Sequence, residues 1–134
     1  MAIDPKMAVL VVDDSSLMAG IVEGFLKQMG FCKIDRAVDG GSALAMMNVR
    51  RYDLVISDWN MQPKTGYTLL RRMRDDPATK TTPFIMMTTE SKAEYIDAAK
   101  RAGVTDYIVK PFTAQVLKAK IDQIFATRLE STSF

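Results

Sequence analysis

The stretch Val9–Asp14, which reads VLVVDD, decides the fold of this chain. Four apolar residues end in two carboxylates, and the same design returns three more times. The later runs are LVIS followed by Asp58, FIMM followed by Thr88, and YIV followed by Lys110. Short apolar runs of this kind are typical of strands buried on both faces of a parallel sheet. Because parallel strands end at one edge of an open α/β sheet, where ligands bind, the sequence predicts both an architecture and a site.

Helical patterns alternate with these runs and give five β–α units. The first helix carries apolar residues at intervals of four, which predicts a stripe facing the core. The stripe consists of Leu17, Ile21, Phe25 and Met29. Ser15 or Ser16 is the expected N-cap of this helix, and Gly30 its expected end.

The remaining elements follow the same alternation. We expect a weaker edge strand at Cys32–Ala37, a helix from Ser42 to about Val49 and a fourth helix at Lys92–Ala102. The third helix should face the core with Leu69, Leu70 and Met73. The last helix should begin after Thr113 and bury Leu117, Ile121, Ile124 and Phe125. With right-handed crossovers, these units form a doubly wound parallel sheet with helices on both faces. We expect one domain over residues 1–134, with a core at about 7–128 and a short flexible C-terminal tail.

Composition and charge exclude several classes of protein. The chain has 134 residues, of which 48% are hydrophobic and 25% charged, as in an ordinary globular domain. A net charge of +2, spread over the chain, gives no basis for nucleic-acid binding. No apolar stretch is long enough to span a membrane, and the N-terminus does not resemble a signal peptide, so we expect a cytoplasmic location.

Cysteine and histidine usage narrows the chemistry further. Cys32 is the single cysteine, so no intrachain disulfide can form, and we expect it to be a buried thiol that packs as a small hydrophobe. The chain has no histidine. Catalysis by Ser-His-Asp or Cys-His groups and zinc sites that need imidazole are therefore excluded. Any bound metal must be held by oxygen, which favours a hard cation such as Mg²⁺.

The polar groups that follow the strands have complementary chemistry. Asp13, Asp14 and Asp58 would lie close together, and a divalent cation would relieve the repulsion between their charges. Lys110 adds a fixed positive charge, and Thr88 adds a hydroxyl donor. Two cationic centres around one carboxylate favour an incoming dianion such as phosphate, with Asp58 as a nucleophile that forms an acyl phosphate.

Each of these groups also has an ordinary structural interpretation. Acidic pairs suit the start of a helix, an Asp after a strand is often a turn residue, and Lys110 or Thr88 could simply end a strand. Taken singly, the structural interpretation is preferred for each residue. Taken together, all at the C-terminal ends of strands, they favour a phosphoryl-transfer site.

The residues now support a family resemblance. The segments VLVVDDSS, SDWNM, FIMMTTES and YIVKPFTA, with AVDGGSAL between them, resemble bacterial response-regulator receiver domains of the chemotaxis, CheY-like class. The resemblance covers essentially the whole chain. It implies a flavodoxin-like fold with strand order 2-1-3-4-5.

The resemblance also implies the roles of individual residues. Asp58 would be the phosphoryl acceptor. Asp13 and Asp14, with Asp58 and the backbone carbonyl of Asn60, would hold Mg²⁺. Lys110 would contact the phosphoryl group.

Further roles implied by the resemblance concern switching and turnover. Thr88 would be the switch hydroxyl and Tyr107 the switch aromatic, although an exposed edge-strand position is the alternative for Tyr107. Asn60 and Glu90 would tune the rate at which the acyl phosphate hydrolyses. Trp59 follows the acceptor directly and is the single tryptophan, which makes it a fluorescence reporter.

The chain departs from the family pattern in three places. The loop after Asp58 has Pro63 one position later than most receivers and Thr65 in place of an acid, a variant seen in alphaproteobacterial proteins of this type. The first helix carries Gly20 and Gly24, which predicts either a smooth contact surface or tolerated surface variation. The resemblance implies a cis Lys110–Pro111 peptide, whereas sequence statistics alone favour trans.

The expected function is that of a phosphorylation-activated binding switch rather than an enzyme. We expect a monomer that takes a phosphoryl group from a histidine kinase and binds a protein target, such as the flagellar motor switch protein, with a phosphatase as a further partner. Lack of an output domain favours action by contact. The alternative is a phosphate sink or relay intermediate that has no motor target. An aspartate-nucleophile phosphohydrolase would carry a second Asp where this chain has Asn60, and a flavin carrier would need a phosphate loop after the first strand.

Overall fold

Five strands and five helices alternate along the chain in a computed structural model that describes residues 6–59, 65–89 and 93–132, with side chains as far as residue 126. The elements are, in chain order, β1 (Ala8–Val12), α1 (Ser16–Gln28), β2 (Lys33–Ala37), α2 (Gly40–Val49), β3 (Leu54–Asp58), α3 (Gly66–Asp75), β4 (Phe84–Thr88), α4 (Ala93–Arg101), β5 (Asp106–Val109) and α5 (Ala114–Thr132). The predicted alternation of five β–α units is confirmed.

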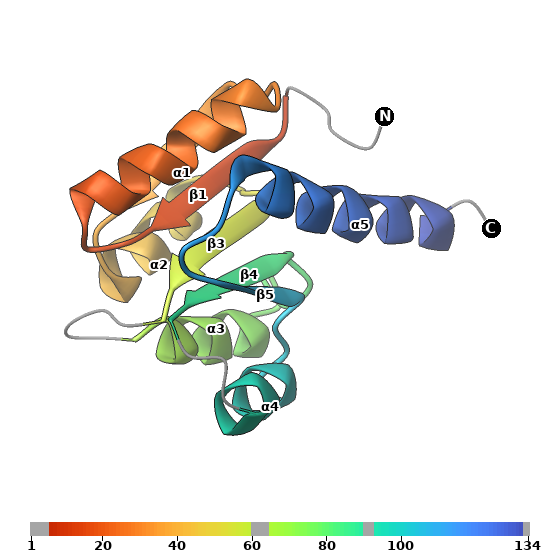
Figure 1. Cartoon of the computed structure of the whole chain (residues 1–134). Coiled ribbons are helices and arrows are strands. Elements are labelled where there is room, and N and C mark those ends of the chain that lie inside the picture. The colour runs from red at the N-terminus through yellow and green to blue at the C-terminus, as the bar shows by residue number, and fades with distance from the viewer. Residues whose placement is uncertain (1–5, 60–64, 90–92, 133–134) are drawn as a thin grey trace.

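All strand pairs are parallel, and the sheet has the order β2-β1-β3-β4-β5 (Figure 1). Each residue of β1, β3 and β4 is buried, as the three apolar runs predict. The mixed strand β2 lies at one edge, where a partly exposed, charged strand is tolerated. The order and the edge position of β2 both confirm the prediction.

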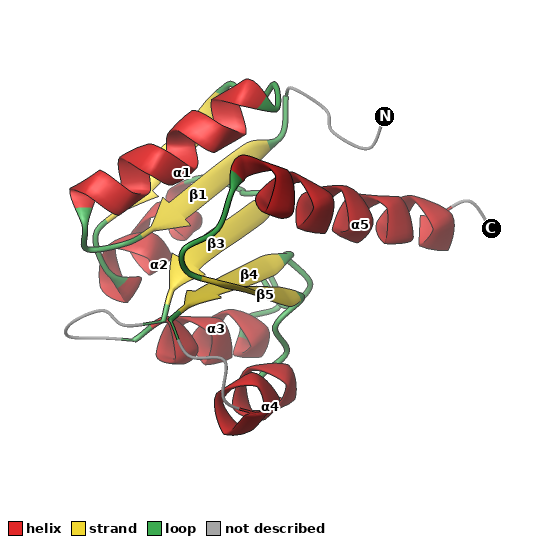
Figure 2. Ribbon diagram, in the orientation of Figure 1, coloured by secondary structure: helices red, strands yellow, loops and turns green. Residues whose placement is uncertain are grey.

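Alternation along the strands divides the core into two layers. Val9 and Val11 of β1 point into the layer that α1 and α5 cover, whereas Leu10 and Val12 point into the layer that α2 and α3 cover. Figure 2 shows the helices on both sides of the sheet, with α1 and α5 toward the viewer. The doubly wound arrangement therefore follows from side chains that alternate between two apolar faces.

The first helix begins as predicted but turns a different face to the core. Ser15 is its N-cap, because its hydroxyl oxygen accepts a hydrogen bond from the Met18 N–H at 3.2 Å. The predicted stripe is wrong at its first two positions, since Leu17 is 76% exposed and Ile21 is 41% exposed. Phe25 and Met29, its other two residues, are half-buried and pack against the core. The buried residues are Ala19, Val22 and Leu26. The helix is apolar on both of these faces, and packing against β1 and α5 selects the second one.

Two helix boundaries differ from the expected ones. Asp39 is the N-cap of α2, since its carboxylate accepts from the Ser42 N–H at 2.7 Å, so this helix begins at Gly40 rather than at Ser42. The last helix continues to Thr132, beyond the expected end of the core at about residue 128. Thr113 caps α5 as predicted, through a bond from the Val116 N–H.

Other predictions meet mixed outcomes. The thiol of Cys32 is exposed, so the expectation of a buried cysteine is wrong; the residue lies just outside the edge strand β2 rather than inside the sheet. The Lys110–Pro111 peptide is cis, as the resemblance implies and against sequence statistics. Gly103 has a φ of 94° just after α4, a conformation that favours glycine and commonly ends a helix. Among the described residues, no helix is both long and apolar enough to cross a membrane.

A hydrogen-bond network stabilises the N-terminal end of the sheet. Asp53 and Ala8 form two bonds of 2.8 Å, in which each backbone N–H donates to the other residue. Asp35 of β2 accepts from the Tyr52 hydroxyl at 2.6 Å and from Arg50 at 2.7 Å. The bond from Tyr52, followed by the bond from Arg50, lowers the pKa of Asp35. Burial, followed by Asp35, raises the pKa of Tyr52 to about 12.

Candidate active site

Three carboxylates meet at the C-terminal edge of the sheet. Asp58 is the last residue of β3, and Asp13 and Asp14 follow β1, which is the neighbouring strand. Val12 pairs with Ser57, so Asp13 and Asp58 lie next to each other. One carboxylate oxygen of each of the three residues lies within 4.8 Å of the others. The structure thus brings together the acidic residues that the sequence predicts to meet.

A lysine from the far side of the sheet reaches this acidic group. Lys110 directly follows β5, and its backbone N–H donates to the carbonyl of Thr88 at 2.8 Å. Its Nζ atom lies 2.9 Å from Oδ1 of Asp58 and 3.7 Å from Oδ2 of Asp13. The lysine side chain is only 17% exposed. A partly buried ammonium group therefore offsets part of the negative charge, and it contacts the carboxylate proposed as nucleophile.

The two ends of the Asp13 carboxylate have different surroundings. Oδ1 accepts a hydrogen bond from the Ser15 N–H at 2.9 Å, which links the acid to the start of α1. Oδ2 is buried and has no hydrogen-bond partner among the described residues. Burial raises the pKa of Asp13, against the opposing effects of the Ser15 bond and Lys110. A buried oxygen without a donor is costly unless a further ligand satisfies it.

The donor set fits a hard divalent cation. Asp14 is exposed, whereas Asp13 and Asp58 are buried, so the three oxygens line a site that opens to solvent on one side. Carboxylates with room for water are what Mg²⁺ prefers, because this ion usually keeps part of its hydration shell. A cation here would also satisfy the buried Oδ2 of Asp13. These three residues could hold Mg²⁺; Asn60, the fourth predicted ligand, lies outside the described residues.

The predicted switch residues lie one strand further along the sheet. Thr88 ends β4 and is buried, and Tyr107 of β5 is half-buried. Both line a small cavity under α4, together with Trp59, Met86, Tyr95, Ile96 and Ala99. Lys120 lies 5.3 Å from the centre of the Tyr107 ring. Tyr107 is therefore neither fully exposed nor fully inserted in this structure.

The sequence did not reveal two features that surround Asp58. Trp59 lies between two tyrosines of different helices: its ring centre is 5.6 Å from that of Tyr67 and 5.5 Å from that of Tyr95. Gly66 begins α3 directly against the backbone of Asp58, where a Cβ atom would overlap the Asp58 carbonyl oxygen. The aromatic contacts join three separate elements, so no local pattern could predict them. Gly66, a glycine shortly after Asp58, was the available signal for the close approach between α3 and the Asp58 backbone.

Some predictions fall outside the described residues. These are the roles of Asn60 and Glu90 in turnover, the Gln62–Lys64 part of the variant loop, and Lys92 at the expected start of the fourth helix. Thr65 is described, and it caps α3 by accepting from the Thr68 N–H at 3.2 Å. This residue thus has a clear structural role in place of the acid found in most receivers.

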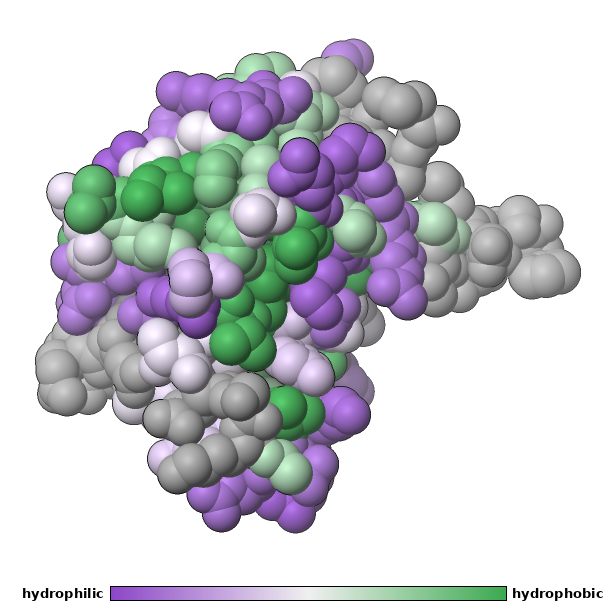
Figure 3. All heavy atoms as spheres, viewed as in Figure 1, coloured by the Kyte–Doolittle hydropathy of each residue, from purple (hydrophilic) through white to green (hydrophobic). Residues whose placement is uncertain are grey.

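Exposed apolar side chains flank the site. Figure 3 shows them gathered over the N-terminal part of α1 and beside the start of α5. The large exposed residues on these two helices are Leu17, Ile21 and Val116. Gly20 and Gly24 are half-buried on α1, and a Cβ atom at Gly24 would meet nothing within 4 Å. Exposed apolar surface of this kind is typical of protein interaction sites.

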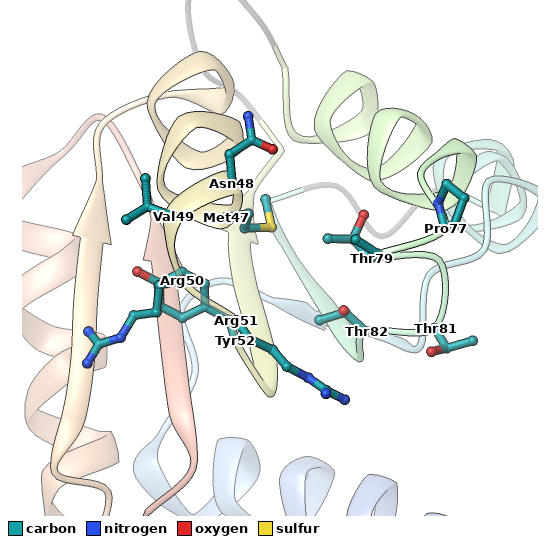
Figure 4. A pocket seen from close by; sticks show the side chains of 11 residues that line it. Met47, Asn48, Val49, Arg50, Arg51, Tyr52, Pro77, Thr79, Thr81 and Thr82 are labelled. Carbon is teal, nitrogen blue, oxygen red and sulfur yellow. The ribbon is translucent and has the colours of Figure 1, made fainter.

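A separate polar pocket lies away from these residues. It has a volume of about 520 Å³ and lies between the end of α2 and the segment that joins α3 to β4 (Figure 4). Its lining includes Arg50, Arg51 and Thr79 but none of the groups at the C-terminal ends of the strands. Arg50 pairs with Asp35 and Thr79 donates to the Met73 carbonyl, so these polar groups are engaged within the fold. The pocket adds nothing to the chemistry of the carboxylates.

The comparisons with known proteins agree on one family. A model of the response regulator receiver domain matches residues 9–122. The chain is 46% identical to the chemotaxis protein CheY of Pseudomonas aeruginosa over 119 residues, which cover 89% of this chain and 96% of that protein. It is 45% identical to CheY-3 of Vibrio cholerae over 123 residues, which cover 92% and 95%.

Solved structures show the same fold. The chemotaxis response regulator CheY4 of Vibrio cholerae aligns with a TM-score of 0.82 at 36% identity, over 89% of this chain and 99% of that one. Strand order, acidic group, sequence relatives and structural neighbours all support the same conclusion. The chain belongs to the family of response regulator receiver domains.

Proposed function

We propose that Asp58 accepts a phosphoryl group from the phosphohistidine of a kinase and that the resulting acyl phosphate switches the chain into a target-binding conformation. One observation carries this proposal: the buried carboxylate of Asp58 lies 2.9 Å from the ammonium group of Lys110 and beside two further carboxylates. An isolated acidic cluster would repel a phosphoryl dianion. The lysine and a bound cation would instead attract it to Asp58.

The transfer itself needs a nucleophile, charge neutralisation and a donor. A carboxylate oxygen of Asp58 forms a bond to phosphorus, and the bond between phosphorus and the imidazole nitrogen of the donor breaks. That nitrogen keeps the electron pair and takes up a proton from solvent. Since the chain has no histidine, the donor imidazole comes from another protein.

Each charged residue has a defined part in this step. Asp13, Asp14 and Asp58 would hold Mg²⁺, with the Asn60 carbonyl as the fourth protein ligand proposed on the family resemblance. The bound ion would neutralise charge on the phosphoryl oxygens, which is the main requirement of phosphoryl transfer. Lys110 releases its contact with Asp58 as the acyl phosphate forms and donates to a phosphoryl oxygen instead.

The switch would follow from the same electrostatics. The hydroxyl of Thr88 moves toward the phosphoryl oxygens, and Tyr107 turns inward under α4, into space that includes the part left by the threonine. The phosphoryl group shifts the balance between two packings because it contacts Thr88 and Lys110 in only one of them. We propose that Asn60 and Glu90 set the lifetime of the acyl phosphate.

The target is the finer part of the proposal. The relatives at 45–46% identity are chemotaxis proteins, which favours a flagellar motor switch protein as the target. The phosphate-sink alternative uses the same chemistry but needs no such target. A pull-down with purified motor switch protein separates the two: beryllofluoride and Mg²⁺ should increase the retained amount at least several-fold, and equal retention with and without them would leave the sink as the function.

Phosphorylation is tested with Trp59 as the reporter. Mg²⁺ with a small phosphodonor, such as acetyl phosphate, should change its fluorescence and add the mass of one phosphoryl group. Asp58→Asn should abolish both effects while the protein stays folded. Asp53→Asn is the matched control, because Asp53 is a carboxylate just before the opposite end of β3. This variant should keep both effects. If the unmodified chain gains no mass and its fluorescence does not change, the proposal is wrong.

A further inference from the structure

An aromatic bridge of Tyr67, Trp59 and Tyr95 joins the acceptor strand to two helices. The Trp59 ring stacks on Tyr67 of α3 at an interplanar angle of 27° and meets Tyr95 of α4 edge-on at 80°. The backbone of Trp59 is fixed, because its N–H donates to the Met87 carbonyl at 2.8 Å and its carbonyl accepts from the Gly66 N–H at 2.9 Å. The ring next to Asp58 is therefore a firm contact point for α4.

The fourth helix has few other attachments to the fold. Ala99 is its one fully buried residue among those described. Tyr95 and Ile96 are half-buried and face the cavity that also contains Thr88 and Tyr107. A helix with one buried residue depends strongly on each of its partly buried contacts. The contact between Tyr95 and Trp59 is thus a substantial part of what holds α4 near the sheet.

The cavity under α4 is too small for an additional ring. The free space between its lining atoms is too narrow to admit a single water molecule. A phenol ring is several times larger than a water molecule, whose share of liquid volume is roughly 30 Å³. Movement of the Thr88 side chain alone frees the space of a few atoms. Tyr107 can therefore enter only if another lining group moves away.

Tyr95 is the lining group best placed to move. The backbone of Trp59 is fixed by its hydrogen bonds and its ring is stacked on Tyr67, while Met86 is fully buried in a central strand. Ala99 is buried, and its methyl side chain cannot rotate away. Tyr95 and Ile96 of α4 are both half-buried, and Tyr95 has the larger side chain of the two and meets Trp59 edge-on rather than stacked. We propose that Tyr95 is a second switch residue, which occupies the space under α4 in the resting state and must leave Trp59 before Tyr107 can turn inward; this rests on the proposed function.

The proposal is tested by the position of Tyr107. The chain has four tyrosines, so 3-fluorotyrosine labelling gives four ¹⁹F resonances that single Tyr→Phe variants assign. Tyr95→Ala removes a ring contact of the kind that shifts an equilibrium roughly two- to twelvefold. Without Mg²⁺ or beryllofluoride, the Tyr107 resonance of this variant should move toward its beryllofluoride-bound position by a corresponding change in population.

Matched variants distinguish a specific role of Tyr95 from a general loss of packing around Trp59. Tyr67→Ala removes the other ring contact of Trp59 without opening the cavity, and it should leave Tyr107 at its resting position. Tyr95→Leu keeps apolar bulk on α4 and provides a second test if Tyr95→Ala does not fold. An unshifted Tyr107 resonance in folded Tyr95→Ala or Tyr95→Leu would overturn the proposal, as would an equal shift in Tyr67→Ala. If beryllofluoride leaves Tyr107 unmoved in the unaltered chain, the proposed function itself fails, which is a distinguishable result.

Discussion

Replacing Gly66 with alanine should destabilise the fold and the acceptor together. Gly66 is the first residue of α3, and its N–H donates to the Trp59 carbonyl at 2.9 Å. A Cβ atom built on this glycine overlaps the carbonyl oxygen of Asp58 and comes within 3.0 Å of Sδ of Met86. The methionine side chain can adjust, but the carbonyl belongs to the backbone of a buried strand. Relief therefore requires a shift of α3 or of Asp58 itself.

The expected magnitude follows from two opposing effects. Overpacking a tight site costs about 1–3 kcal/mol. The preference of a helix for alanine over glycine returns at most about 1 kcal/mol, and less at a first helical position. The free energy of unfolding should therefore fall by about 1–2 kcal/mol. With a urea dependence of about 2 kcal/mol per molar, the midpoint of unfolding falls by roughly 0.5–1 M.

Urea unfolding followed by Trp59 fluorescence measures the effect, with Gly24→Ala as the control. Gly24 lies inside α1, where a Cβ atom meets nothing within 4 Å, so this variant should be up to about 1 kcal/mol more stable than the unaltered chain. Phosphorylation by a small donor should slow in Gly66→Ala and stay unchanged in Gly24→Ala. If the urea midpoint of Gly66→Ala is at or above that of the unaltered chain, the close approach of Gly66 to Asp58 does not make the added methyl group destabilising.

Four further predictions concern charge, capping and pH. Lys110→Ala removes the cation beside Asp58, so Mg²⁺ should bind several-fold more tightly and phosphorylation should be lost. A fluorescence titration of Trp59 measures the Mg²⁺ affinity, and weaker binding in the variant would contradict the site as described. Ser15→Ala removes the N-cap of α1 and should lower the free energy of unfolding by about 1 kcal/mol, whereas Ser16→Ala, one residue inside the helix, should not lower it. Because the pKa of Asp35 is lowered from its ordinary value of 3.8, the ionised carboxylate stabilises the fold above that pH, and this stabilisation is lost as the pH falls below it. The difference in urea midpoint between the unaltered chain and Asp35→Asn should therefore shrink as the pH is lowered through and below 3.8. Because the pKa of Tyr52 is raised from 10.0 to about 12, the protonated hydroxyl stabilises the fold below pH 10, and this stabilisation is lost as the pH rises toward 12. The difference in the free energy of unfolding between the unaltered chain and Tyr52→Phe should therefore decrease in that range.

The sequence predicts the strand ends well because their chemistry is local. Asp58 and Thr88 each end a run that can only be a buried strand, and the geometry of parallel sheets then brings them to one edge. The cap at Ser15 and the stripe on α5 are local in the same sense. The order of the strands, by contrast, came from the family resemblance and not from any pattern within the chain.

The failures concern choices that only tertiary packing can make. In α1 the predicted stripe through Leu17 competes with the stripe through Val22, and both are apolar. The helix buries the second because its neighbours β1 and α5 meet it on that side. Cys32 was expected inside because cysteines are usually buried, yet its place just before an edge strand exposes it. The contact between Trp59 and Tyr95 joins residues 36 positions apart, so no window of sequence contains it.

The uneven burial of the sheet has a consequence for how the molecule opens. Every residue of β1, β3 and β4 is buried, whereas β5 and α4 each contain one buried residue. Amide protons of the three central strands should exchange with solvent only through global unfolding, while those of β5 and α4 should exchange through smaller, cheaper openings. A receiver built this way keeps Asp58, its proposed nucleophile, on the slowest-exchanging part of the chain. The elements proposed to respond to phosphorylation, β5 and α4, belong to the part of the fold that opens most often.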